Sequence, residues 1–283
     1  MAISAAQVME LRASTGAGMM DCKKALLETD GDLEKAGEYL RKKGIATAAK
    51  KASRQTNEGG IAVALDAGRK TAAMAHLACE TDFVARNEQF RALLQSLADH
   101  VLAHGAENVG GQQTDSGETV DERITQGIAT MGENLQLVDA VQLSVEGEGL
   151  IGAYVHSNGR IGVLVALGSD GPADAAALGE VAKDLAMHVA ASQVSAIAPE
   201  DIDPALLAKE KEIYTAQALE SGKPEAIAAK MVEGRLSKFM KENSLLHQPF
   251  VKDPDLTVEK LLAEKGKALG VKLKVQRFFK YQF

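Results

Sequence analysis

The stretch GIAVALDAGR at residues 60–69 has a second version, GLIGAYVHSNGR, at residues 149–160. Each reads as a strand that ends in a turn at a Gly-Arg pair. Each is followed by another apolar run, at residues 72–79 and at residues 161–167, which predicts a β-hairpin. An internal repeat of this kind indicates two related structural units in the middle of the chain.

The repeat continues beyond the hairpins into a helical pattern. The interval from Asp82 to His100 equals the interval from Asp170 to His188, and the two histidines lie in the similar sequences ADHVLA and AMHVAA. A hairpin followed by one helix predicts an antiparallel sheet with a helix on one face, so we expect an α+β fold with two repeated core subdomains. Because the repeat pairs the two histidines, it favours a shared packing role over catalysis.

Three short helices are predicted before the repeat. Apolar periodicity and stop signals place them at residues 4–14, at residues 19–29 and from a cap at Asp30 or Asp32 to Gly44. Together they form a small three-helix module. Residues 45–59 are rich in Ala, Lys and Gly without an apolar period, which predicts a solvated linker.

The remaining elements follow from the same signals. A helix at Val120 to Met131 ends at Gly132, and a strand at Leu135 to Val145 is assigned to the second copy. Residues 204–246, broken by SGKP at 221–224, predict two helices that form a projecting antiparallel hairpin. A helix at 258–266 and a β-like run at 271–283 complete the chain. The expected boundaries are 1–54 for the module and linker, 55–136 and 137–203 for the core subdomains, 204–248 for the hairpin and 249–283 for a segment that returns to the core.

The composition limits the function classes. Hydrophobic residues make up 46% of the 283 residues and charged residues 25%, as in ordinary globular proteins. The net charge of -7 and the absence of Trp argue against direct nucleic-acid binding, and no apolar stretch is long enough to cross a membrane. No targeting segment is recognisable, which predicts a cytoplasmic protein. The two cysteines, Cys22 and Cys79, read as buried thiols, and no phosphate-binding loop or metal motif occurs.

Four stretches carry a resemblance to a known family. They are LRASTGAGMMDCKKAL at 11–26, ETDFVA at 80–85, HVAAS at 188–192, and KMVEGR at 230–235 continuing to QPFV at 248–251. In this order they closely resemble bacterial elongation factor Ts over nearly the whole chain. The resemblance implies a ubiquitin-associated-like N-terminal module, a two-part α+β core and a helical hairpin. It also implies a guanine-nucleotide exchange factor, rather than an enzyme, with no cofactor or metal of its own.

The resemblance assigns the acting segment to Thr81, Asp82, Phe83 and Val84, which would disturb the magnesium and phosphate site of elongation factor Tu. From the residues alone, Phe83 reads as a core side chain and Asp82 as a helix cap. The second copy has DGP at 170–172 where the first has DFV at 82–84. The fold therefore does not require an aromatic residue there, which favours a functional role for Phe83.

The resemblance also implies further contacts with the partner at Arg12, Met19, Met20, Gly132 and His156. Their sequence context leaves other interpretations open. Arg12 can be a solvated helix charge, and His156 an exposed turn residue. Of Met19 and Met20, one is expected in the core and the other at the surface.

The expected partner is elongation factor Tu in its GDP-bound and nucleotide-free forms. If the factor weakens GDP binding, GDP must weaken factor binding equally. A 2:2 assembly through the hairpin is left open. Two other classes also stay open: a hydrolase built on Cys79, Asp82 and His100, and an adaptor that binds protein tails through the N-terminal module.

Overall fold

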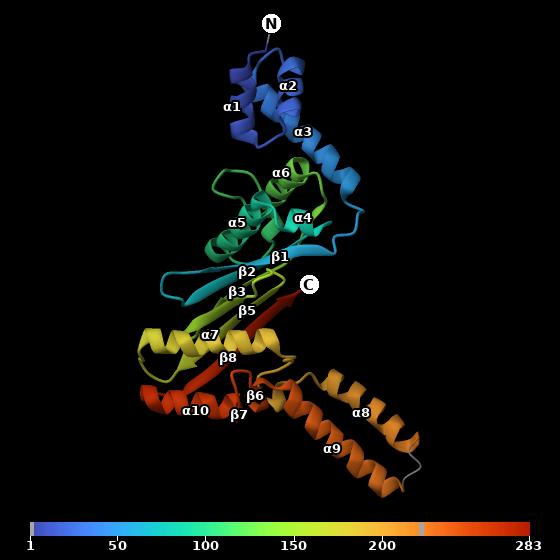
Figure 1. The fold of residues 1–283 in the computed structure, drawn as a ribbon, viewed down its shortest axis with the longest axis vertical. Helices are drawn as coiled ribbons and strands as arrows, with labels where there is room; N and C mark the ends of the chain where they lie inside the picture. The colour runs from blue at the N-terminus through green and yellow to red at the C-terminus, as the bar shows by residue number, and fades with distance from the viewer. Residues whose placement is uncertain (1–2, 221–223) are drawn as a thin grey trace.

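The computed structural model describes residues 3–220 and 224–283 and shows an α+β protein, as the sequence predicts. Two three-stranded antiparallel sheets form its centre. In Figure 1 a helical module extends from one end of this core and a helical hairpin from the other. The predicted turn at 221–224 lies outside the described residues except for Pro224.

The N-terminal module consists of α1 (Ala5–Thr15), α2 (Met19–Glu28) and α3 (Leu33–Lys51). Asp32 is the residue that caps α3, since its side chain accepts hydrogen bonds from two backbone amides. The predicted end of α3 at Gly44 is wrong, because the helix continues for two more turns. Gly44 is buried against the core, and a Cβ atom there would lie 3.4 Å from Cβ of Ala129. The small side chains let α3 lie close to the core, and packing stabilises a segment that looked like a linker.

The first copy of the repeat contains a complete sheet in the order β1-β2-β3. Its third strand, β3, is the strand predicted at Leu135 to Val145. The assignment of that strand to the second copy is wrong, because β3 pairs with β2. Helices α5 and α6 cover the outer face of this sheet around Phe90 and Leu97. The elements are β1 (Glu58–Leu65), β2 (Thr71–Cys79), α4 (Asp82–Ala85), α5 (Glu88–His104), η1 (Val109–Gly111), α6 (Val120–Met131) and β3 (Leu135–Ser144).

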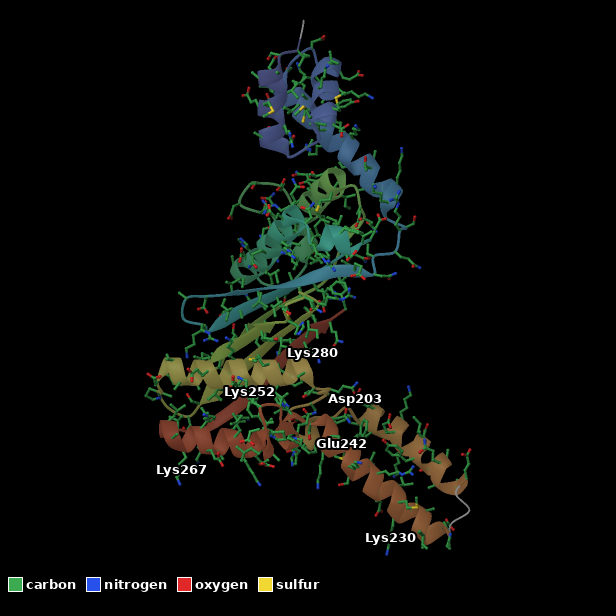
Figure 2. All side chains as sticks on the ribbon, viewed as in Figure 1. Asp203, Lys230, Glu242, Lys252, Lys267 and Lys280 are labelled. Carbon is green, nitrogen blue, oxygen red and sulfur yellow. The ribbon has the colours of Figure 1, made fainter. Side chains whose placement is uncertain are left out.

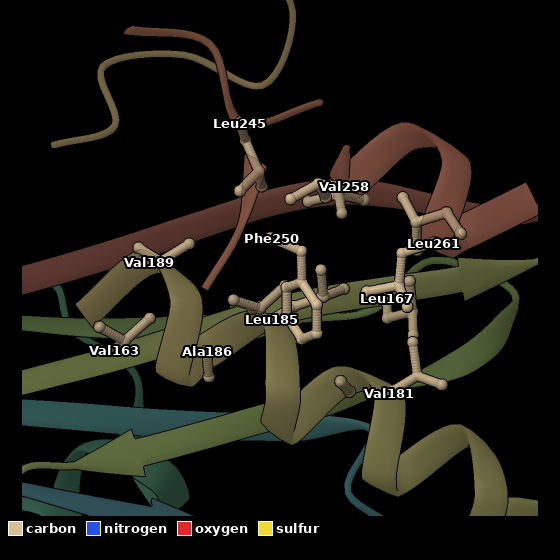
Figure 3. Packing of buried hydrophobic residues seen from close by; sticks show 14 of the residues in the cluster. Val163, Leu167, Val181, Leu185, Ala186, Val189, Leu245, Phe250, Val258 and Leu261 are labelled. Carbon is tan, nitrogen blue, oxygen red and sulfur yellow. The ribbon is translucent and has the colours of Figure 1, made fainter. Parts of the chain in front are cut away.

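The second copy has a sheet in the order β4-β5-β8, whose third strand comes from the C-terminal end of the sequence. Helices α7 and α10 cover its outer face, and Figure 3 shows Leu185, Phe250 and Val258 packed together in this core. The elements are β4 (Glu148–Val155), β5 (Ile161–Ser169), α7 (Ala175–Ala191), η3 (Leu245–His247), β6 (Pro249–Phe250), β7 (Asp253–Thr257), α10 (Val258–Leu269) and β8 (Leu273–Gln282).

The helical hairpin interrupts the second copy. The first copy proceeds from α5 through η1 to α6 and β3, and the second proceeds in the same order from α7 through η3 to α10 and β8. Between α7 and η3 the chain forms η2 (Pro199–Asp201), α8 (Pro204–Glu220) and α9 (Glu225–Asn243). Figure 2 places Asp203 and Glu242 at the base of this hairpin and Lys230 toward its far end. The hairpin is therefore an insertion into a repeated unit.

The two sheets pack face to face. Ile61 and Met74 of the first sheet and Ile151 and Leu164 of the second form a buried cluster between them. A Cβ atom on Gly162 would lie 2.3 Å from Ile61, so close packing of the sheets requires glycine at that position. Figure 1 shows the resulting order of layers, with helices outside and two sheets inside.

Candidate functional site

The segment 81–84 lies where β2 ends and the short helix α4 begins. Thr81 has extended backbone geometry, and its hydroxyl oxygen accepts a hydrogen bond of 3.4 Å from the amide of Val84. Thr81 is thus the helix cap, and the interpretation of Asp82 as the cap is wrong. Asp82 is the first residue of the helix and forms an ion pair of 3.0 Å with Arg86.

Phe83 points away from the core, and 83% of the residue is exposed. Its neighbours Val84 and Ala85 are half-buried and pack against the core formed by α5, α6 and the first sheet. The core interpretation of Phe83 is therefore wrong. A large aromatic side chain displayed by a helix of four residues is costly to leave in water and suited to insertion into another protein.

A carboxylate from a neighbouring element holds the start of this segment. Glu133 follows Gly132, which ends α6 with a left-handed φ of 77°. One carboxylate oxygen accepts hydrogen bonds from the backbone amides of Glu80 and Thr81, at 3.1 and 3.0 Å. The other accepts a bond of 2.6 Å from the Thr81 hydroxyl. Sequence reasoning singled out Gly132 and missed Glu133.

A second group of contacts joins Glu80, at the start of the segment, to Arg54, which follows the end of α3. The amide of Asn134 donates to Glu80 at 2.7 Å, and its side chain donates to the carbonyl oxygen of Arg54 at 3.0 Å. Arg54 lies 3.4 Å from the Glu80 carboxylate. The Asn134 amide and the Arg54 guanidinium both lower the pKa of Glu80, so this carboxylate stays ionised.

Cys79 is fully buried beside this segment, and its thiol donates a hydrogen bond of 3.2 Å to the carbonyl oxygen of Thr81. Burial, with a contribution from the charge of Glu133, raises the pKa of Cys79 to about 12. A thiol that remains protonated near neutral pH is a poor nucleophile. His100 instead faces Gln112, with 2.8 Å between Nε2 and Oε1, so the contacts described here do not assemble the alternative hydrolytic site.

The structure brings His156 near Asp82. Both residues line a cleft of about 510 Å³ between α4, α5 and the turn that joins β4 to β5, together with Arg86, Arg91 and Arg160. His156 is exposed, and its Nδ1 lies 3.0 Å from Oδ1 of Asn158. The carbonyl oxygen of Gly159 accepts a 2.9 Å hydrogen bond from the amide of Ile61, which fixes this turn to the first sheet.

The remaining predicted residues lie elsewhere. Arg12, Met19 and Met20 are on α1 and α2, at a distance from α4 in Figure 1. Met19 is 50% exposed and Met20 is 74% exposed, so the expectation that one of them belongs to the core is wrong. Gly132 is exposed, and its carbonyl oxygen accepts a hydrogen bond from the side chain of Lys51.

Over the described ranges 3–220 and 224–283, no group of three or more His, Cys, Asp or Glu side chains is arranged to hold a metal ion. No helix in this part of the chain is both long enough and apolar enough to span a membrane.

Comparison with known proteins defines the class. Residues 80–283 match the family model for elongation factor TS. Elongation factor Ts of Nitratidesulfovibrio vulgaris strain DP4 is 47% identical over 100% of this chain and 96% of its own length. Elongation factor Ts of Clostridium botulinum strain Alaska E43 is 46% identical over 99% of this chain and 92% of its own. The exposed Phe83 segment therefore belongs to a translation elongation factor. The chain is a member of the elongation factor Ts family.

Proposed function

We propose that this protein is a guanine-nucleotide exchange factor for elongation factor Tu, and that Phe83 is the side chain that promotes GDP release. The observation that carries the proposal is the exposure of Phe83, 83% of which is open to solvent at the tip of α4. The family match supports the identity of the partner. The two hydrogen bonds from Thr81 to Glu133 support a fixed backbone at the start of the segment that presents the ring.

The mechanism follows from what GDP binding requires. A GTPase holds GDP through a magnesium ion and a phosphate-binding loop, so displacement of either weakens the nucleotide. An aromatic ring can enter between packed elements of the partner because it brings a large apolar area with little rotamer freedom to lose. Each tenfold increase in GDP dissociation constant requires about 1.4 kcal/mol of such disturbance. Asp82, beside the ring, brings a carboxylate near the displaced cation.

Other contacts hold the complex while Phe83 acts. Arg12 on α1 and Met19 and Met20 on α2 are exposed side chains of the N-terminal module. We assign this module as ubiquitin-associated-like and propose that these residues dock on the nucleotide-binding domain of the partner. Exposed methionines suit such a surface because their side chains adapt to different shapes. Gly132 and His156 contribute contacts from the core.

The test is the release of a fluorescent GDP from elongation factor Tu, followed by stopped flow at a series of factor concentrations. The unaltered protein accelerates release. Phe83→Ala reduces the acceleration about thirtyfold or more, the effect of losing about 2 kcal/mol at an interface hot spot. The matched control is Val138→Ala, which truncates another exposed side chain, 50% exposed, on β3.

Two results would contradict the proposal. If the unaltered protein leaves the GDP release rate unchanged, exchange activity is absent. If Phe83→Ala and Val138→Ala are equally active, exchange does not depend on the ring.

A further inference from the structure

We infer that Glu133 is a positioning residue, which orders the segment that presents Phe83 without itself touching the partner. The inference rests on the proposed function. The half-buried Glu133 carboxylate receives three hydrogen bonds, two from successive backbone amides and one from the hydroxyl of Thr81. Thr81 in turn caps the helix that carries Phe83.

The segment needs such support because α4 is too short to be stable alone. Its residues run only from Asp82 to Ala85, and none of them is fully buried. A single turn of helix orders several backbone angles for few hydrogen bonds, so a free segment of this length is mostly unfolded. The Glu133 carboxylate fixes the backbone immediately before the helix. Hydrogen bonds to an ionised acceptor are stronger than neutral ones, which suits this task.

The second copy of the repeat shows that the fold does not need a carboxylate at this position. Glu80 and Asp170 occupy equivalent places, because Asn134 donates its amide to Glu80 at 2.7 Å just as Lys272 donates to Asp170 at 2.7 Å. The residue before Lys272, equivalent to Glu133, is Val271. The hydrogen bond from a backbone amide to the carboxylate of Glu80 therefore has a counterpart at Asp170 in the second copy. The Glu133 carboxylate has no such counterpart and is specific to the copy that presents Phe83.

The segments that follow differ in the same way. The first copy uses residues 81–86 to reach Asn87, the cap of α5, and these residues form α4 together with its two flanking caps. The second copy uses only residues 171–173 to reach Asp174, the cap of α7, and has no helix there. A valine suffices where no segment has to be ordered. The extra segment and the carboxylate occur together, which is what a positioning role requires.

The experiment compares Glu133→Ala and Glu133→Gln with Asp170→Asn, which alters a carboxylate that accepts a backbone hydrogen bond in the second copy, where no segment presents an aromatic ring. At saturating factor, Glu133→Ala lowers the maximal rate of GDP release about tenfold, and Glu133→Gln, which keeps one acceptor oxygen, has a smaller effect. The factor concentration that gives half the maximal rate changes little, because the other contacts are intact. Asp170→Asn retains the maximal rate.

A double variant separates positioning from direct contact. If Glu133 acts through Phe83, then Glu133→Ala causes no further loss in a Phe83→Ala background. An equal loss in both backgrounds would overturn the inference, because Glu133 would then act on the partner or on the fold as a whole. A Glu133→Ala protein as active as the unaltered one would also overturn it.

Hydrogen exchange gives a readout that does not depend on exchange-factor activity. In Glu133→Ala, the amides of residues 81–86 exchange about tenfold faster, while those of α7 keep their protection. Unchanged protection at 81–86 would overturn the inference even if Phe83→Ala behaves as proposed. If Phe83→Ala is fully active, the proposed function fails, but this measurement still tests the ordering by Glu133. Glu133→Gln provides the same test if Glu133→Ala does not fold.

Discussion

The two copies of the repeat share a scaffold and differ in one short connection. In both, a histidine of the long helix contacts a glutamine after a 3₁₀ turn: His100 lies 2.8 Å from Gln112, and His188 lies 2.9 Å from Gln248. In both, a left-handed glycine follows the last helix, at Gly132 with φ 77° and Gly270 with φ 74°. These shared features serve the fold, because they occur with and without the Phe83 segment.

Even where the residue types differ, the two copies satisfy the same structural need. The side chain of Gln142 donates to two carbonyl oxygens at the end of α5. Lys280 stands at the equivalent place in β8 and donates to the carbonyl oxygens of Val189, Ala190 and Ser192 at the end of α7. Helix C-termini leave carbonyl groups without partners, and both copies satisfy them from the third strand.

Phe83 with its segment, Glu133 and the inserted hairpin each occur in one copy of the repeat and not in the other. The comparison therefore separates residues that the fold needs from residues that are available for function. It also corrects the alignment of the copies, since the hydrogen bonds equate Asp170 with Glu80 rather than with Asp82. In the sequence, the equal intervals from Asp82 to His100 and from Asp170 to His188 suggested that Asp82 and Asp170 are equivalent. In the structure, the connection before the long helix is longer in the first copy, at residues 81–86, than in the second, at residues 171–173.

The largest expected effect comes from making the two copies alike. Replacing residues 81–86 with the connection of the second copy, Gly171-Pro172-Ala173, removes α4 and the aromatic ring together. We expect GDP release to slow at least as much as in Phe83→Ala, about thirtyfold, while the protein stays folded with a lower unfolding temperature, because the core contacts of Val84 and Ala85 are lost. Stopped flow and circular dichroism measure the two quantities. Retained exchange activity would show that the copies do not divide fold from function at this connection.

A smaller effect tests whether the copies have equivalent cores. Leu97 of α5 and Leu185 of α7 are both almost fully buried. Leu97→Ala and Leu185→Ala each leave a cavity, and we expect each to lower the free energy of unfolding by about 2–5 kcal/mol. Urea denaturation measures the change. GDP release should stay unchanged where both variants are folded, and a loss confined to one copy would break the equivalence.

The smallest effect concerns the paired histidines and pH. Burial lowers the pKa of both His100 and His188 in the folded protein. As the pH falls through about 6.5, the unfolded chain takes up protons that the folded protein does not, and stability is lost by at most about 1.4 kcal/mol per pH unit for each group. His188 should contribute more, because it is 1% exposed and its Nδ1 accepts the amide of Val251 at 3.1 Å.

The check is the free energy of unfolding between pH 7 and pH 5. The free energy of unfolding should fall less steeply between pH 7 and pH 5 in His188→Gln than in His100→Gln. An equal slope in both variants would show that the two histidines are equivalent in environment as well as in position.

The sequence predicted elements whose signals are local. The cap of α3, at one of the two predicted residues, the glycine that ends α6 and the turns of both hairpins depend on neighbouring residues, and they stand where the sequence placed them. The length of α3 was missed because Gly44 weakens a helix in isolation, whereas burial against Ala129 stabilises it here. The exposure of both Met19 and Met20 was missed because two adjacent helical positions do not reveal which face meets the core.

By itself, the sequence determined the α+β class and the existence of a repeat, because periodicity, capping and turn residues act over a few positions. The segment that carries Phe83 was singled out by the family resemblance, since its own residues favoured a core side chain. Only the tertiary structure decided which strands share a sheet, since β3 and β8 pair with strands far away in sequence. It also decided that Glu133 holds Thr81. That contact joins residues on separate elements, and nothing local to either of them predicts it.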